Sequence, residues 1–168
     1  MEEVKCYMPK TLAEALEIKS KVDVIPLAGG SDLMVSHKRT IGLVPVFEKP
    51  VMIIRNLPEL KGIRINEKGE CFIGACCTSN EIATSPLCPW HLRQAASRMG
   101  AVGLRNSATI AGNIANASPK GDTPGPLYLL DARVKLSSVR GEREELVSDF
   151  IVAFRNIDLK SDELITEI

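Results

Sequence analysis

The chain has 168 residues, with 21 basic and 21 acidic side chains, so its formal net charge is zero. This balance, together with an aromatic content of only 4%, argues against general nucleic-acid binding, which needs a basic surface. No apolar run approaches the roughly 20 residues of a membrane-spanning helix, and the acidic start MEEVKCYMPK is unlike a signal peptide, so we expect a cytoplasmic protein without a membrane partner.

The N-terminal part of the sequence, residues 1–57, has the pattern of a small parallel βαβ lobe. A capping-box sequence at residues 11–14 (TLAE) precedes apolar residues at helical spacing, which predicts a helix over 11–21. Short apolar runs at 24–27 and 51–54 predict buried strands. The segment between the two strands contains two prolines, and we expect it to be partly helix and partly loop.

The remainder, residues 58–168, is predicted to form an α+β lobe with an antiparallel sheet. Runs at 62–65 and 71–74 flank a turn that ends in Gly69, which favours a hairpin. The other expected elements are a short helix after the capping box at 78–81, a helix through 92–99 followed by Gly100, a helix over 123–130 that begins near Pro124, and strands at 134–136, 145–147 and 163–168.

Five cysteines raise the question of a metal site. Cys71, Cys76 and Cys77 could in principle hold an iron–sulfur cluster or zinc. Residues 71–77 look like a strand, however, and alternation would point Cys76 and Cys77 to opposite faces. We therefore expect no metal ligands and instead reduced, mostly buried thiols, as is usual in the cytosol.

A first glycine-rich loop, PLAGGSDL, spans residues 26–33 directly after a predicted strand. Without a Cβ, Gly29 and Gly30 let the backbone turn sharply and approach a ligand. Successive N–H groups there can converge on phosphate oxygens, Ser31 can add a hydroxyl, and Asp32 can cap the next turn. The alternative is an ordinary tight turn, and this loop alone does not decide between the two.

A second segment, residues 107–122, reads SATIAGNIANASPKGD and is more distinctive. It is rich in small residues and too apolar for a solvent-exposed loop, which indicates a backbone packed closely against a ligand. The alternative is an irregular connection whose asparagines satisfy its own turns.

The two segments together resemble the paired motifs of the FAD-binding domain of the molybdopterin dehydrogenase family. That family includes flavoprotein subunits of xanthine dehydrogenase and aerobic carbon monoxide dehydrogenase. The resemblance covers essentially the whole chain and departs at Ala111, where many relatives have glycine. It implies the α+β, two-lobed FAD-binding fold of the p-cresol methylhydroxylase/vanillyl-alcohol oxidase type.

By this resemblance the first loop wraps the FAD pyrophosphate and the second segment holds the other side of the cofactor. Met99 would make an apolar contact, Asp122 would bond the ribityl or flavin side, and Ile165 would lie near the flavin. Neither His37 nor His91 is a convincing covalent attachment site. The full set of implied FAD-binding residues is Ala28, Gly29, Gly30, Ser31, Asp32, Leu33, Met99, Thr109, Ile110, Ala111, Gly112, Asn113, Asp122 and Ile165, with no catalytic residue or metal ligand.

The function implied by the resemblance is an oxidoreductase component that cannot work alone. It would take electrons from iron–sulfur clusters and pass them to NAD or O2, with an iron–sulfur subunit and a molybdopterin subunit as partners. Relatives continue into a smaller C-terminal domain, which this sequence lacks, so an assembly or regulatory module without flavin chemistry is the alternative. A MurB-like reductase or a vanillyl-alcohol-type oxidase would need substrate residues or a covalent histidine that we do not find.

Overall fold

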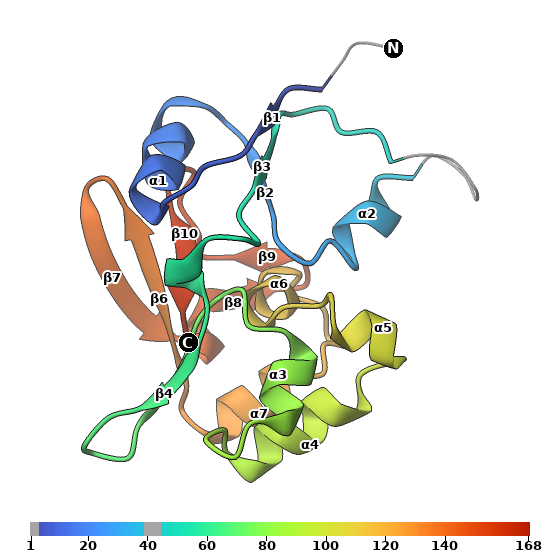
Figure 1. Cartoon of the computed structure of the whole chain (residues 1–168), viewed down its shortest axis with the longest axis vertical. Coiled ribbons are helices and arrows are strands. Elements are labelled where there is room, and N and C mark those ends of the chain that lie inside the picture. Colours follow the sequence, from blue (N-terminus) through green and yellow to red (C-terminus); the bar gives the residue numbers. More distant parts are fainter. Residues whose placement is uncertain (1–3, 39–44) are drawn as a thin grey trace.

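A computed structural model describes residues 4–38 and 45–168 (Figure 1). Its N-terminal part holds a parallel sheet of β1 (Cys6–Tyr7), β3 (Val51–Ile53) and β2 (Ile25–Leu27), in the order β1-β3-β2. Helix α1 (Leu12–Lys21) connects β1 to β2. The strands expected at 24–27 and 51–54 are confirmed, whereas β1 was not expected. Of the segment predicted to be partly helical, residues 39–44 lie outside the described part.

Helix α1 begins at the predicted cap. The Thr11 hydroxyl accepts from the Glu14 N–H at 3.2 Å. The Glu14 carboxylate, however, accepts from the Lys10 N–H at 2.8 Å and not from the Thr11 N–H, so the expected reciprocal box is displaced by one residue. At the other end, the ammonium of buried Lys19 donates to the Val24 carbonyl at 3.1 Å, which ties the helix to the start of β2.

The rest of the chain forms antiparallel pairs. The predicted hairpin is confirmed as β4 (Ile63–Ile65) and β5 (Cys71–Ile73), and Gly69 in its turn has a φ of 82°. A three-stranded sheet follows in the order β10 (Leu164–Glu167), β6 (Arg133–Ser138), β7 (Gly141–Leu146), as expected for 58–168. A small hairpin of β8 (Ile151–Ala153) and β9 (Asn156–Ile157) was not expected.

Helices α3 and α4 cover one end of the molecule together with α7 (Figure 1). The capping box at Thr78 is complete, with Glu81 bonded in both directions. The segment 107–122 is not irregular throughout, because α6 lies within it. The bounds of the short helices are α2 (Leu33–Ser36), a 3-10 turn (Pro58–Leu60), α3 (Ser79–Thr84), α4 (Trp90–Arg98), α5 (Val102–Arg105), α6 (Ile110–Ala115), α7 (Pro124–Leu129) and α8 (Val147–Phe150).

One continuous core joins the two parts of the chain. It includes Ala15 of α1, Met52 of β3, Phe150 of α8 and Leu164 of β10. Helix α1 also packs on β6, so the parallel sheet is anchored to the antiparallel one. The core provides a fixed frame for the loops that leave the ends of β2 and α5. Among the described residues no helix combines the length and the apolar character that crossing a bilayer requires.

The cysteines are free thiols. The strand expected over 71–77 is too long, because β5 ends at Ile73 and the next residues form a turn. Cys76 and Cys77 are both buried, and their thiols donate to different carbonyls, those of Ile54 at 3.7 Å and Gly62 at 3.2 Å.

Candidate functional site

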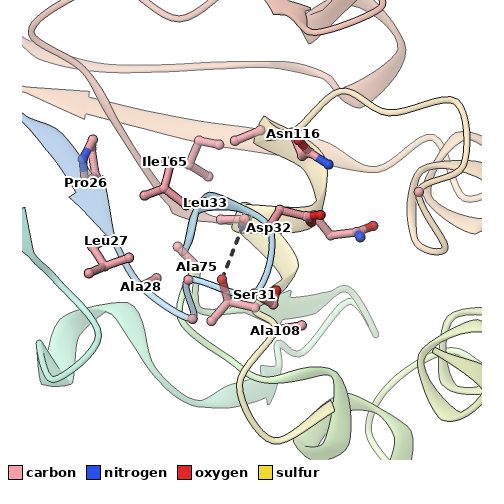
Figure 2. A pocket seen from close by; sticks show the side chains of 18 of the residues that line it. Pro26, Leu27, Ala28, Ser31, Asp32, Leu33, Ala75, Ala108, Asn116 and Ile165 are labelled. Atoms are coloured by element: carbon pink, nitrogen blue, oxygen red, sulfur yellow. Dashed lines mark hydrogen bonds between the residues drawn. The ribbon is translucent and has the colours of Figure 1, made fainter. Parts of the chain in front are cut away.

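A cavity of about 800 Å³ opens between the two glycine-rich segments (Figure 2). Its wall is built by the β2–α2 loop, the connection from α4 to α5, α6 with the loop that follows it, and β10. This volume lies in the range of small-molecule and cofactor sites. Polar groups come mainly from the loops, while Met99, Leu104, Leu164 and Ile165 contribute apolar surface.

The first loop, residues 28–33, presents its backbone to this cavity. Gly30 has a φ of 71°, and its carbonyl accepts from the Met34 N–H at 2.9 Å, which holds the turn into α2. Within the described ranges 4–38 and 45–168, none of the N–H groups of residues 29–33 donates to another residue. Because they line the cavity, these amides are donors available to a ligand.

Asp32 does not act as expected. It is the N-cap residue of α2, but it has a helical backbone conformation and its side chain makes no capping hydrogen bond. The carboxylate is exposed at the cavity. The Asp32 carbonyl accepts from the N–H groups of Val35 at 3.1 Å and Ser36 at 2.9 Å, which are ordinary backbone hydrogen bonds of the first helical turn.

The second segment uses its backbone differently. The N–H groups of Ile110 and Ala111 donate to carbonyls of the segment 75–77, at 3.0 and 3.3 Å. The N–H of Gly112 donates to the hydroxyl of the N-cap residue Thr109 at 3.3 Å. The first turn of α6 is therefore already bonded inside the protein, and its amides are not available to a ligand.

Beyond α6, a side-chain contact fixes the loop to α7. The Asn113 Oδ1 accepts from both the N–H and the hydroxyl of Thr123, at 3.1 and 2.7 Å. Thr123 is fully buried, so Asn113 satisfies two polar groups that have no access to water. This contact holds the adjoining Asp122, whose exposed side chain lines the cavity.

The two segments touch at Gly29. A Cβ on this residue would overlap the Ser107 carbonyl oxygen and lie 3.2 Å from the Ala108 Cα. In Figure 2, Ser31 of the first loop and Ala108 of the second lie on the same side of the cavity. Only glycine permits this approach, so the prediction that the two segments meet at one site agrees with the geometry.

The structure brings together all of the predicted site residues except one. Ile110 does not line the cavity: its side chain is fully buried in the core. The residues that do line it are Ala28, Gly29, Gly30, Ser31, Asp32, Leu33, Met99, Thr109, Ala111, Gly112, Asn113, Asp122 and Ile165.

Several lining residues were not predicted. His37 is the C-cap residue of α2 and also lines the cavity. Arg155, in the turn between β8 and β9, also lines the cavity. Its N–H donates to the Ala117 carbonyl, and both residues have a left-handed backbone, with φ values of 55° and 44°. No local sequence signal marks such non-glycine left-handed residues. The other unpredicted residues include Cys76, Leu104, Lys120 and Leu159.

Cys76 gives the cavity wall an inert thiol. The side chain is 4% exposed, and burial raises its pKa to about 12. A thiol with this pKa stays protonated at neutral pH, so it serves as an apolar wall and not as a nucleophile.

A two-part α+β fold with a glycine-lined, amide-rich cavity defines the class of dinucleotide-cofactor-binding domains. Comparison with known protein families shows which family of this class the chain belongs to. Residues 2–168 match the model of the FAD binding domain in molybdopterin dehydrogenase, and the chain belongs to this family. The match confirms the resemblance found in the sequence and FAD as the cofactor.

Curated relatives extend the match. The nicotinate dehydrogenase FAD-subunit of Eubacterium barkeri is 35% identical, over 100% of this chain and 58% of the relative. The glyceraldehyde dehydrogenase medium chain of Sulfolobus acidocaldarius is 33% identical, over 95% of this chain and 56% of the relative. The chain thus spans a little over half the length of these relatives.

Solved structures confirm the fold class. Reconstituted CO dehydrogenase from Oligotropha carboxidovorans superimposes with a TM-score of 0.87 at 26% identity, over 98% of this chain and 58% of that chain. The CO dehydrogenase from Hydrogenophaga pseudoflava gives a TM-score of 0.86 at 27% identity, over 98% and 57%.

Proposed function

We propose that the chain is the FAD-carrying part of a molybdenum-containing hydroxylase. It would take electrons from iron–sulfur clusters on a partner subunit and pass them to NAD or O2, while a molybdopterin subunit oxidises the substrate. The names of the relatives, FAD subunits and medium chains of dehydrogenases, support this assignment. The free thiols also suit our expectation of a cytoplasmic protein.

One observation carries the proposal: the donor set of the first loop fits a pyrophosphate. The five N–H groups of residues 29–33 have no protein partner within the described residues, and these residues line a cavity large enough for a cofactor. Ser31 adds a hydroxyl. A dinucleotide pyrophosphate carries two negative charges, and converging backbone amides can stabilise it without a lysine cluster, as expected for a chain of zero net charge.

The remaining wall suits the rest of the cofactor. Met99, Leu104 and Ile165 can cover an aromatic ring and exclude water from it. The Asp122 carboxylate can accept hydrogen bonds from ribityl hydroxyls. When bound, the flavin supplies the redox chemistry, collecting electrons singly and releasing them in pairs. The role of the chain is to bind the flavin, orient it and set its surroundings.

Flavin uptake is the first test. The purified chain is expected to bind added FAD and to show a flavin absorbance spectrum, with free FAD released on heating. A colourless chain that takes up no FAD would contradict the proposal and favour the alternative, a module for assembly or regulation without flavin chemistry.

Paired glycine variants test the phosphate site. In Gly30→Ala the new Cβ would lie 3.0 Å from the Met34 Cγ and 3.1 Å from the Leu27 Cδ1, at a left-handed φ. Gly69→Ala is the matched control, because Gly69 is also left-handed but has nothing within 4 Å. Each variant should lose about 1 kcal/mol of stability. Only Gly30→Ala should weaken FAD binding, by about tenfold or more; equal binding by both would refute the placement.

A further inference from the structure

Two cysteine thiols meet at the edge of the core. Cys71 is the first residue of β5, and Cys88 lies in the connection between α3 and α4. The Cys88 thiol donates a hydrogen bond to the Cys71 sulfur. The thiols of Cys76 and Cys77 donate to backbone carbonyls instead. Cys71 and Cys88 are therefore a pair in which one thiol is the partner of the other.

The pleat of β5 directs Cys71 to the core. Successive residues of a strand point to opposite faces of the sheet. Phe72 lies on the face where Arg64, its cross-strand partner in β4, covers its ring at 4.2 Å from the centroid. Ile73 lies on the other face and is buried. Cys71 shares the face of Ile73 and packs against the core cluster that includes Cys88, so the contact between the thiols follows from the register of a regular hairpin.

The two thiols differ in exposure and in their affinity for a proton. Cys71 is partly exposed, whereas Cys88 is 4% exposed. The hydrogen bond from Cys88 lowers the pKa of Cys71, because it stabilises the thiolate. The same bond, together with burial, raises the pKa of Cys88, which keeps its proton. Cys71 is thus both the more accessible and the more nucleophilic of the two.

Two adjacent thiols can bind a metal or form a disulfide. Among the described residues no group of three or more His, Cys, Asp or Glu side chains is placed to hold a metal ion, and a protein metal site needs more ligands than this pair supplies. We propose that Cys71 and Cys88 form a redox site, at which hydrogen peroxide converts the two thiols reversibly into an intramolecular disulfide. The disulfide joins β5 to the connection between α3 and α4. No flavin takes part, so the site is independent of the proposed function.

The oxidation takes two steps. The Cys71 thiolate attacks one oxygen of the peroxide, the O–O bond breaks, and hydroxide leaves while Cys71 becomes a sulfenic acid. The hydroxide takes up the proton that Cys71 lost on ionisation. The Cys88 sulfur then attacks the Cys71 sulfur, the S–S bond forms, and the Cys88 proton leaves with the sulfenic hydroxyl as water. The sulfurs lose two electrons together, the peroxide is reduced to two waters, and an external dithiol reverses the change.

The segment around Cys88 can supply the movement that the bond requires. The two sulfurs must approach from hydrogen-bond contact to about 2.05 Å. Residues 85–89 lie outside the helices, and Leu87 is 41% exposed. The Cys88 N–H donates to the Ser85 carbonyl at 3.4 Å, which is longer than a usual N–H···O bond. Cys88 can therefore shift toward Cys71 without breaking a helix or a strand.

Thiol titration and peptide mapping after treatment with hydrogen peroxide test the proposal. A Cys6→Ser background is used, because exposed Cys6 can link two chains. Of the five cysteines this leaves four, and peroxide should lower the number of titratable thiols from four to two. Cleavage after Glu81 places Cys71 and Cys88 on separate peptides, which should stay joined until dithiothreitol is added. Fragment ions cut between Cys71 and Cys76 identify the linked sulfur.

Three variants separate the roles of the sulfurs. In Cys88→Ser the sulfenic acid of Cys71 has no thiol to resolve it, so dimedone should trap it. In Cys71→Ser the buried Cys88 should stay reduced, and no disulfide should form. Cys77→Ser is the matched control: Cys77 is also buried and lies on the same peptide as Cys71, but its thiol donates to a backbone carbonyl, so the disulfide should still form.

Mapping with both cysteines in place decides the question even where a variant fails to fold. No disulfide in the folded chain, a disulfide through Cys76 or Cys77, or one that forms only in urea would refute the redox site. A cross-link to Cys88 that persists in Cys71→Ser would refute it as well. FAD uptake is measured separately, so the failure of the redox site leaves the proposed function standing, and a chain that binds no FAD can still form the disulfide.

Discussion

The two glycine-rich segments look alike in sequence but use their backbones in opposite ways. In residues 29–33, no N–H group donates to another residue of the described ranges, and the loop borders the cavity. In α6 and its approach, the first N–H groups donate to residues 75–77 and to Thr109. The first segment therefore offers hydrogen-bond donors to a ligand. The second segment is the scaffold against which the first segment packs, at Gly29 and Ser107.

The difference teaches that small residues serve two separate purposes. Gly30 supplies a left-handed turn that exposes amides, whereas Gly29 permits direct contact with the Ser107 carbonyl. The first N–H groups of the second segment are bonded within the protein, to residues 75–77 and to Thr109, so this segment should be formed without a ligand. The first has unsatisfied donors and should be stabilised by one. This contrast can be tested at Gly29, where the two segments touch, at Asn113 within the second segment, and at Cys76 in the cavity wall.

The largest effect is expected at the contact between the segments. Gly29→Ala places a Cβ on the Ser107 carbonyl, where backbone on both sides must shift. We expect a loss of about 3 kcal/mol in the free energy of unfolding, as for overpacked sites, and a loss of FAD affinity of at least about a hundredfold. Urea unfolding and FAD titration measure the two effects.

Gly125→Ala is the matched control for this contact. Gly125 lies in α7, and a Cβ there would have nothing within 4 Å. Alanine in a helix should be neutral or slightly stabilising. If Gly29→Ala behaves like Gly125→Ala, the two segments do not press against each other and the comparison fails.

A smaller effect is expected within the scaffold. Asn113→Ala leaves the buried N–H and hydroxyl of Thr123 without their acceptor. We expect a loss of about 2 kcal/mol in stability and weaker FAD binding, because Asp122 adjoins Thr123. Asn116→Ala is the control: Asn116 also lines the cavity, but its side chain makes no hydrogen bond to the described residues. Equal stabilities of the two variants, measured by thermal unfolding, would show that the scaffold does not depend on this bond.

The sequence predicted those features whose causes are local. The caps at Thr11 and Thr78, the left-handed Gly69 and the helix start at Pro124 each depend on neighbouring residues, and all are present. The paired loops could also be found, because their composition is unusual and the resemblance is specific.

What could not be predicted depends on distant partners. Strand β1 has two residues and exists because it pairs with β3. Helix α6 forms although it contains a glycine and an asparagine, because the N–H groups of Ile110 and Ala111 donate to carbonyls in 75–77. These hydrogen bonds orient α6 so that the Ile110 side chain is buried in the core. This is why Ile110, which the family motif placed in the cofactor site, does not line the cavity. His37 lines the cavity because of the direction in which α2 runs, and no local sequence pattern indicates that direction.

The smallest effect is expected at Cys76 in the cavity wall, where removing FAD should not change the reactivity of the thiol. Burial raises the pKa of the Cys76 thiol to about 12, so between pH 7 and 9 it should stay protonated and resist iodoacetamide, while exposed Cys6 is alkylated. If the second segment is formed without a ligand, removing FAD leaves this difference intact, because protein atoms alone bury Cys76. Peptide mass spectrometry of the FAD-bound and FAD-free chain reports both thiols. Alkylation of Cys76 as fast as Cys6 without FAD would mean that the ligand builds both segments, and the distinction between donor and scaffold would not hold.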